Sequence, residues 1–238
     1  MTVNYKFKTK PYDHQRTAMD HAGKKDAYGF FMEMGTGKSK VLIDNLGSLF
    51  LEGKCNFALI IAPKGVYRNW VAKEIPEHMS DDVPHRVIRW VSSPNKKQRQ
   101  ELNSIKDAYS GLTIFVMNVE AFSTVKGQNA GMWLAKRLGK FGMIAIDEST
   151  TIKNHKAKRT KSLMKVAEGF SFRRLLTGSP VTKSPLDVFS QCEFLRPGLL
   201  GYDSYWAFQS RYAVVKKQNM GGRSFTQVVG YRNLDELT

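Results

Sequence analysis

Four short apolar runs along the chain are continuous rather than alternating. They are FALIIA at 57–62, LTIFVM at 112–117, MIAI at 143–146 and RLL at 174–176. Strands buried on both faces have this pattern, because helices cover both sides of a parallel sheet and leave no strand face to water. The runs therefore predict the strands of a parallel sheet.

Apolar residues at helical spacing separate these runs. Three expected helices carry Leu42, Leu46, Leu49 and Phe50, then Val66, Trp70 and Ile75, then Leu186, Phe189, Glu193 and Phe194. Strands that alternate with helices predict an α/β doubly wound domain, a mostly parallel sheet flanked by helices on both faces. We place this domain at residues 1–197. An aromatic and polar extension follows at 198–238, where Gly221 and Gly222 predict a hairpin turn.

Polar residues follow the predicted strands at once. Pro63 and Lys64 come after FALIIA, Asp147 comes after MIAI, and Thr177 comes after RLL. Ligands of open α/β sheets bind beyond the carboxyl ends of the strands. We therefore expect these polar ends to meet in one crevice.

The segment after Met34 has the composition of a phosphate-binding loop. It consists of Gly35, Thr36, Gly37, Lys38 and Ser39. The two glycines let the backbone curl, so that successive N–H groups face an anion at the start of a helix. The lysine can reach the β- and γ-phosphates of ATP, and the serine offers a hydroxyl to Mg²⁺. Met32 stands where the strict pattern has its first glycine, so an ordinary strand-to-helix turn stays an alternative.

The acids Asp147 and Glu148 stand at the end of a predicted strand. A phosphate-binding loop needs an acid for Mg²⁺ at such a place, and Asp147 is suited to that role beside Ser39. Glu148 is suited to polarise the attacking water. Two acids that cap the following helix are the alternative, but the pairing with Lys38 upstream favours an ATP site.

Taken in order, four segments resemble helicase motifs I, Ia, II and III. They are MEMGTGKSK, IIAPKGVYRNWVAKE, IAIDESTTIKN and LLTGSPVTKSPLDVFSQCEFLRPG, and they are similar to Swi/Snf-type DNA translocases of helicase superfamily II. The resemblance covers roughly residues 11–196 and continues more loosely beyond them. It implies a RecA-like lobe that hydrolyses ATP with Mg²⁺. It also implies a second RecA-like lobe, in cis or in trans.

The resemblance implies roles for single residues. Gln15, in YDHQ, would recognise adenine, and Thr177 and Ser179 would couple the nucleotide state to nucleic acid. In the motif II tetrad, Ser149 and Thr150 stand where the family usually has Ala and His. ATP chemistry should survive this change, whereas the relay through Thr150 departs from the family pattern.

The arginines that complete the ATP site in the family belong to the second lobe. Arg173 and Arg174 precede a predicted strand, at the end opposite Thr177. We therefore expect both to point away from the nucleotide. An isolated lobe should then hydrolyse ATP slowly, because a catalytic arginine is worth roughly 10³ to 10⁵ in rate.

The net charge of +16 favours a polyanionic partner. Residues 136–174 hold eleven Lys or Arg against three Asp or Glu, which is +8, half of the excess. We expect duplex DNA to be bound through its phosphates, independently of sequence. The candidate contacts are Lys64, Arg68 and Asn69 after a strand, and Lys158, Lys161 and Lys165 on one face of a helix. A solvated basic surface is the alternative.

We interpret the chain as the ATP-binding lobe of a DNA-dependent ATPase that moves along duplex DNA. A strand-separating helicase, a restriction-enzyme motor and a non-hydrolysing regulatory module are the alternatives. No apolar run could span a bilayer, no secretion signal is evident, and Cys55 and Cys192 are interpreted as ordinary buried thiols. We expect a cytoplasmic protein without a membrane partner, in the host cytoplasm if viral, since the small size resembles phage or bacterial relatives.

Overall fold

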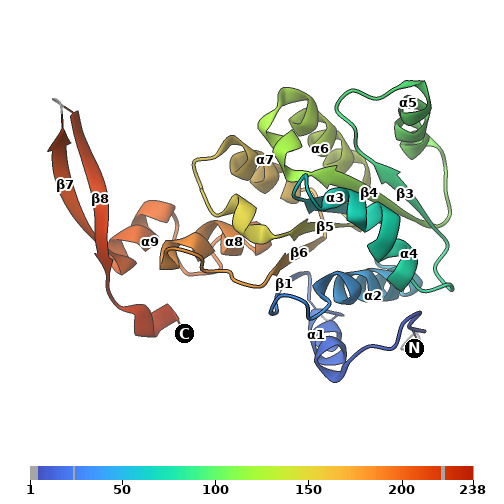
Figure 1. The fold of residues 1–238 in the computed structure, drawn as a ribbon, viewed down its shortest axis with the longest axis horizontal. Helices are drawn as coiled ribbons and strands as arrows, with labels where there is room; N and C mark the ends of the chain where they lie inside the picture. Colours follow the sequence, from blue (N-terminus) through green and yellow to red (C-terminus); the bar gives the residue numbers. More distant parts are fainter. Residues whose placement is uncertain (1–4, 24, 221–222, 238) are drawn as a thin grey trace.

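A six-stranded parallel sheet forms the centre of the molecule (Figure 1). The computed structural model describes residues 5–23, 25–220 and 223–237. In spatial order the strands are β1 (Ala27–Phe31), β6 (Phe172–Thr177), β5 (Gly142–Asp147), β2 (Phe57–Ala62), β4 (Leu112–Asn118) and β3 (His85–Arg89). The parallel strands place all their carboxyl ends at one edge of the sheet.

The continuous apolar runs are confirmed as strands, and β2 is buried at every residue. The sequence missed β3, in which only Ile88 is fully buried. This strand lies at the edge of the sheet, and its Arg86 donates to the hydroxyl of Thr113 and to the carbonyl of Ser104. An edge strand with charged side chains lacks the apolar signal that marks the central strands.

Helices cover both faces of the sheet, as predicted (Figure 1). The α-helices of the main body are α1 (Asp13–Gly23), α2 (Lys38–Leu51), α3 (Tyr67–Asn69), α4 (Ile75–His78), α5 (Lys96–Asn103), α6 (Val125–Leu138), α7 (Lys158–Ala167) and α8 (Val188–Leu195). Short 3₁₀ turns are η2 (Ser104–Lys106), η3 (Val119–Ser123), η4 (Gly139–Phe141), η5 (Ser149–Ile152) and η6 (Pro185–Asp187). The expected helix around Trp70 is interrupted by a π-helical turn, η1 (Trp70–Glu74).

Alternate residues of each central strand enter two separate cores. Ala58 and Ile60 of β2 pack with α2 and the η1–α4 segment, whereas Leu59 and Ile61 pack with α6 and α7. Because successive side chains of a strand point to opposite faces, a continuous apolar run supplies both cores at once. The sheet is thereby held rigidly between two helical layers.

Arg174 forms hydrogen bonds that connect helices with β6 at the amino ends of the strands. β6 begins at Phe172, two residues before the predicted run at 174–176, so Arg173 and Arg174 both lie inside the strand rather than before it. The buried Arg174 guanidinium donates to Asn45 Oδ1 at 3.0 Å and to the carbonyls of Ala22 and Lys25. These bonds join α1, α2 and β6 at the end of the sheet opposite Thr177, so this arginine is committed to the fold.

The carboxyl-terminal part projects from the body as α9 (Tyr205–Tyr212), the antiparallel pair β7 (Ala213–Met220) and β8 (Arg223–Tyr231), and the turn η7 (Leu234–Leu237) (Figure 1). Phe208 and Tyr212 of α9 pack against Leu186 and Phe189 in a third apolar cluster. The predicted hairpin turn at residues 221–222 lies outside the described residues. The boundary after residue 197 stays a prediction, because this cluster spans it.

No described helix is long and apolar enough to cross a membrane. Cys55 is buried, as predicted, and burial raises the pKa of its thiol to about 12. Cys192 is half-buried rather than fully buried, and burial raises the pKa of its thiol to about 11. Both cysteines are therefore protonated and unreactive at neutral pH.

Candidate functional site

The glycine loop turns from β1 into α2 at the carboxyl edge of the sheet. Gly35 and Gly37 both have φ of 78°, a conformation that favours glycine. The ammonium of Lys38 donates to the carbonyls of Met32 at 3.0 Å and Glu33 at 2.9 Å, so the lysine folds back over its own loop. The predicted loop and the helix after it are both present, and the strand before them is β1.

Gln15 supports this loop from α1. Its side chain is buried, and its Nε2 donates to the Thr36 carbonyl at 2.9 Å, while its Oε1 accepts from the Tyr12 amide at 3.0 Å. A Cβ on Gly37 would lie 2.3 Å from Gln15 Nε2, so a side chain at this position would displace the Gln15 amide. Gln15 therefore positions the loop, a role that sequence analysis missed, and its contact with adenine stays a prediction.

Asp147 ends β5 with its carboxylate held by two donors. Trp70 Nε1 donates to Oδ2 at 2.9 Å, and the Glu148 amide donates to Oδ1 at 3.0 Å. Burial raises the pKa of Asp147 above its usual value, although the bond from Trp70 and the charge of Lys38 act in the opposite direction. Trp70 was predicted only as a core residue, and its partner lies 77 positions away along the chain.

Glu148 has a left-handed backbone, with φ of 49°. For a residue with a side chain this conformation costs about 1 to 3 kcal/mol, and such residues cluster at functional sites. The turn η5 begins immediately after Glu148. The strained residue therefore marks the point where the chain leaves β5 and enters the site.

One pocket of about 500 Å³ joins these parts. Its walls come from the glycine loop, from the end of β5 and from the α3–η1–α4 segment. Its lining residues are Met34, Gly35, Gly37, Lys38, Ser39, Val66, Asn69, Trp70, Lys73, Glu74, Glu77, His78, Asp147 and Glu148. The predicted ATP and Mg²⁺ ligands Lys38, Ser39 and Asp147 and the predicted general base Glu148 therefore meet in one place.

The expected crevice does not include every polar strand end. Lys64, Thr177 and Ser179 are not among the described residues that line this pocket. Asn69, predicted as a DNA contact, is in its wall instead, and its Nδ2 donates to Glu74 Oε1 at 2.8 Å. A contact between Asn69 and DNA stays a prediction.

The loop after β6 packs directly against the glycine loop. The Thr177 carbonyl accepts from the Met32 amide at 3.2 Å, and the Thr177 hydroxyl accepts from the Ser179 amide at 3.2 Å. A Cβ on Gly178 would lie 3.3 Å from the Met34 nitrogen. The two loops are therefore in direct contact, and the coupling role of Thr177 and Ser179 stays a prediction.

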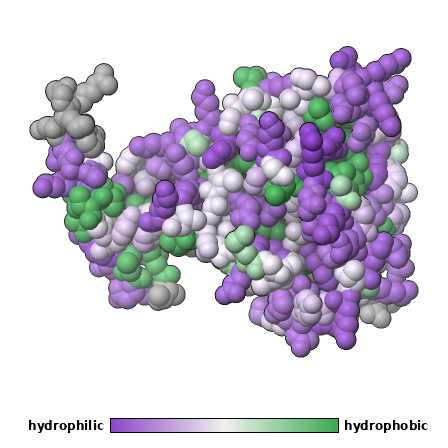
Figure 2. All heavy atoms as spheres, viewed as in Figure 1, coloured by the Kyte–Doolittle hydropathy of each residue, from purple (hydrophilic) through white to green (hydrophobic). Residues whose placement is uncertain are grey.

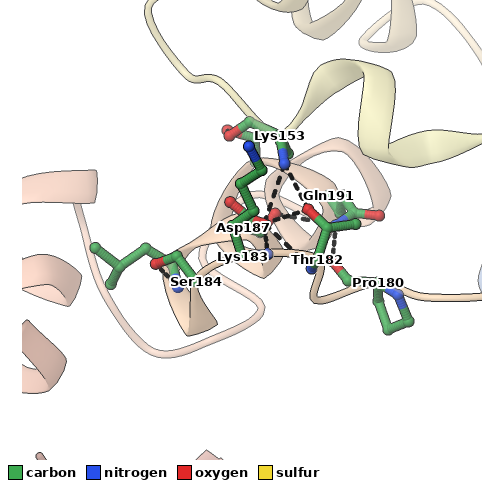
Figure 3. A network of polar contacts seen from close by, with 9 residues as sticks. Lys153, Pro180, Thr182, Lys183, Ser184, Asp187 and Gln191 are labelled. Atoms are coloured by element: carbon green, nitrogen blue, oxygen red, sulfur yellow. Dashed lines mark hydrogen bonds and ion pairs between the residues drawn. The ribbon is translucent and has the colours of Figure 1, made fainter. Parts of the chain in front are cut away.

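A buried hydrogen-bond chain connects motif II with the same loop. Ser149 Oγ donates to Gln191 Oε1 at 2.5 Å, and Gln191 Nε2 donates to the Pro180 carbonyl at 2.7 Å. Figure 3 shows Gln191 reaching Pro180 beside the network around Asp187. Sequence analysis assigned coupling to Thr150, which is half-buried in η5, and missed Gln191.

Asp187 is the centre of that polar network (Figure 3). Its Oδ2 accepts from the Lys153 ammonium at 3.3 Å, from the Thr182 hydroxyl at 2.7 Å and from the Lys183 amide at 3.1 Å. Burial alone would raise the pKa of Asp187, but these hydrogen bonds lower it below the usual value. The network holds η6 against the segment that follows motif II.

The predicted basic face of α7 is exposed. Lys158, Lys161 and Lys165 are open to solvent, while Leu163 and Ala167 are buried on the opposite side. Met164, predicted to point inward, is half-buried.

Two further candidate DNA contacts, Lys64 and Arg68, are exposed as well. The Lys64 amide donates to Glu120 Oε1 at 3.3 Å, so an acid lies beside this position. All the candidate lysines are accessible, and their contact with DNA stays a prediction.

Residues 21–230 match the family described as SNF2-related domain. The DNA annealing helicase and endonuclease ZRANB3 of Bos taurus is 25% identical over 209 residues, which are 86% of this chain and 17% of that protein. Protein p41 of Acyrthosiphon pisum secondary endosymbiont phage 1 is 26% identical over 221 residues, 87% of this chain and 43% of that protein. The chain thus spans less than half the length of either relative.

The fold is similar to a solved structure, the Sulfolobus solfataricus SWI2/SNF2 ATPase core in complex with dsDNA. The TM-score is 0.67 at 20% identity, and the match covers 89% of this chain and 41% of the archaeal chain. This likeness confirms the predicted RecA-like fold with helices on both faces of the sheet.

Proposed function

The chain belongs to the SNF2-related domain family, and from this we propose that it is the ATP-binding lobe of a DNA-dependent ATPase that moves along duplex DNA. One observation carries the proposal. The phosphate-binding lysine, Lys38, and the two motif II acids, Asp147 and Glu148, line a single pocket at the carboxyl edge of the sheet. A protein that only binds nucleotide has no need of the second acid.

The residues of this pocket fit a magnesium nucleotide. The loop amides and Lys38 would hold the phosphates, and Ser39 and Asp147 would hold Mg²⁺. The fit rests on the half-buried, doubly hydrogen-bonded carboxylate of Asp147, which faces the same pocket as the loop. Bound Mg²⁺ neutralises charge on the phosphates. Trp70 fixes the direction of the Asp147 carboxylate, as second-layer hydrogen bonds do at metal sites.

Glu148 is the general base in this proposal. It lines the pocket beside Asp147 but lies beyond the strand end, where the left-handed turn directs the chain away from β5. Its carboxylate would accept the proton of the attacking water. The two adjacent acids therefore take different roles because one ends the strand and the other begins the turn.

Coupling to DNA would pass through the loop after β6. Thr177 and Ser179 belong to that loop, and the bonds from Ser149 to Gln191 and from Gln191 to Pro180 connect it with motif II. Thr150 occupies the position of the usual relay residue of the family. We propose that Gln191 supplies the connection that a histidine at that position would make.

Duplex DNA is the proposed partner, bound through its phosphates by Lys64, Arg68 and the α7 lysines. The net charge of +16 supports this. The archaeal core similar to this chain was solved with dsDNA. The proposed place of action is the cytoplasm, or the host cytoplasm if the protein is viral.

A second RecA-like lobe, in cis or in trans, would complete the ATP site. No arginine is among the described residues that line the pocket, and Arg174 is committed at the opposite end of the sheet. A phosphoryl-transfer site of this type gains roughly 10³ to 10⁵ in rate from an arginine. That arginine is therefore expected from the second lobe.

Steady-state ATP turnover, with and without duplex DNA, tests the proposal. We expect slow turnover by this chain alone and a strong rise, dependent on duplex DNA, when the second lobe is added. Nucleotide binding without turnover under all conditions would favour a regulatory module. Strand displacement that exceeds triplex displacement would favour a strand-separating helicase.

A further inference from the structure

A second hollow, of about 720 Å³, lies between the main body and the carboxyl-terminal extension. We call it the extension cleft. It is lined by Lys153, Asn154, His155, Lys156, Ser184, Leu186, Asp187, Tyr205, Trp206, Gln209, Thr226, Val228 and Tyr231. None of these residues lines the nucleotide pocket, so the extension cleft is a separate site.

Aromatic rings form one wall of the extension cleft. The ring of Tyr205 stacks on His155 with centroids 3.5 Å apart and meets Trp206 edge to face at 5.5 Å. Phe189 of the apolar cluster packs edge to face against Tyr205, with ring centroids 5.6 Å apart. Trp206 stands on this fixed base with 57% of its surface exposed. His155 and Tyr205 meet this indole edge to face, and no described aromatic ring stacks parallel to it, so the exposed ring offers a stacking surface.

The charge of the extension cleft is positive. The Lys156 ammonium lies 4.8 Å from the centroid of the Trp206 ring. Asp187 is the single acid among the described lining residues, and its Oδ2 already accepts from Lys153, Thr182 and Lys183. The acid is therefore neutralised within the protein, while Lys156 stays exposed.

The extension cleft adjoins the basic face of α7. Lys156 lies two residues before the helix that carries Lys158, Lys161 and Lys165. Lys161 lines a neighbouring hollow that shares His155 with the extension cleft. That hollow also contains Arg173, Glu168 and Glu193, so its two acids offset the charges of Lys161 and Arg173, whereas Lys158 and Lys165 lie outside it.

We infer that the extension cleft binds an unpaired nucleotide of DNA, with the base stacked on Trp206 and the adjacent phosphate at Lys156. A base in a duplex has both faces covered by its neighbours, so stacking on a protein ring requires a base that has left the helix. Aromatic rings beside a basic groove are the usual means of holding single strands without sequence preference. The inference rests on the proposed DNA function and deepens it: the preferred DNA is a duplex that carries a single-stranded tail or branch.

Apolar groups on the hairpin also surround this end of the molecule. Val214, Val215 and Val229 are exposed, and Figure 2 shows apolar patches near the hairpin on a face that is otherwise mostly hydrophilic. An acidic peptide could use the same charge and apolar surface. A peptide carries no nucleobase, so it would give neither a preference for tailed DNA nor quenching of 2-aminopurine, and this separates the two occupants experimentally.

The test compares two fluorescent DNAs of equal duplex length, one blunt and one with a short single-stranded tail that contains 2-aminopurine. We expect the chain to bind the tailed DNA more tightly and to quench the 2-aminopurine. Trp206→Ala should weaken binding of the tailed DNA about 5- to 150-fold, the range for loss of one stacked base. Binding of blunt DNA should change less than twofold.

Matched variants decide the reason for any loss. Trp206→Phe should restore part of the preference and the quenching, because it keeps an aromatic face. Trp133→Ala removes another partly exposed tryptophan, on α6 and outside the extension cleft, and should leave the preference intact. Thermal unfolding of each variant shows whether α9 has kept its place.

The outcomes separate this inference from the proposed function. One contrary result is an equal loss of affinity for blunt and tailed DNA in Trp206→Ala, and another is a parent that does not quench 2-aminopurine. Either result would overturn the unpaired-base site without affecting the proposed DNA-dependent ATPase. Failure of the parent to bind either DNA would overturn both. Competition by poly-glutamate that depends on Lys156 but not on Trp206, without a tail preference, would assign the extension cleft to an acidic peptide instead.

Discussion

The nucleotide pocket and the extension cleft are built in opposite ways. The nucleotide pocket is walled by the glycine loop after β1, by the end of β5 and by the α3–η1–α4 segment, so strands of one sheet fix the points from which Lys38 and Asp147 extend. The extension cleft is walled by a loop, a short helix and a hairpin strand, held together by rings such as Tyr205 and His155. The first suits chemistry that tolerates little displacement, and the second suits a flexible ligand.

The largest expected effect sharpens the assignment of chemistry to the nucleotide pocket. Glu148→Gln should keep binding of magnesium ATP but lower turnover of the two-lobe protein about 10²- to 10⁴-fold, because the general base is lost and the metal ligand remains. Glu77→Gln is the matched control, since Glu77 lines the same pocket without a catalytic role. Unchanged turnover in Glu148→Gln would show that another group accepts the proton.

A second prediction concerns the support of Asp147. Trp70→Phe removes the hydrogen bond to Asp147 Oδ2 and keeps most of the buried ring. We expect the Mg²⁺ concentration that gives half-maximal turnover to rise about 10- to 100-fold, the usual effect of losing a second-layer bond to a metal ligand. Nucleotide binding without Mg²⁺ should stay close to the parent value. An unchanged Mg²⁺ requirement would reduce Trp70 to a packing residue.

The third prediction addresses the connection between motif II and the loop after β6. Gln191→Leu leaves the Ser149 hydroxyl and the Pro180 carbonyl without their partner. We expect the stimulation of turnover by DNA to fall several-fold while ATP affinity stays the same. Ser190→Ala is the control, because it removes a neighbouring buried hydroxyl that bonds to the Lys153 carbonyl instead. Equal stimulation by DNA in the Gln191 variant and in the control would show that the hydrogen bonds from Ser149 through Gln191 to Pro180 have only a structural role.

The smallest expected effect per residue is the loss of DNA affinity when lysines on the basic face of α7 are replaced. Replacement of Lys158, Lys161 and Lys165 by Ala should weaken binding of blunt duplex DNA alike on all sequences. It should also reduce the slope of log K against log salt by up to about 0.9 per lost phosphate contact. A control with Lys96, Lys97 and Lys106 replaced removes equal charge elsewhere. The same slope in both triple variants would show that α7 is only a solvated face.

The same contrast explains what the sequence could predict. The glycine loop and the acids after β5 depend on local patterns, a buried run followed by a polar end, and they were found where predicted. Trp70 and Gln191 were missed because their partners lie 77 and 42 positions away, and only the fold brings them together. Some residues of the extension cleft lie in the motif II and motif III segments, such as Lys153 and Asp187, but no motif predicts that they meet Tyr205 and Trp206. Their proximity depends on packing of α9 against Phe189.

The strands show the same limit. The central strands β2 and β4 are apolar throughout because both faces are covered, so the chain itself marks them. Only Ile88 of β3 is fully buried, and Arg86 extends along the sheet edge to Ser104. Such a strand forms because it pairs with its neighbour in the sheet, and the local pattern of apolar residues does not indicate that pairing.

Binding of magnesium ATP to Lys38→Ala is the most direct test of the central claim, that the glycine loop and the β5 acids form a nucleotide site. The measurement is titration of the parent, of Lys38→Ala and of Lys97→Ala, an exposed lysine distant from the loop, with thermal unfolding as a check on the loop carbonyls that Lys38 holds. The account predicts that Lys97→Ala binds as the parent does and that Lys38→Ala, still folded, loses binding. Parent-like affinity in folded Lys38→Ala would contradict it.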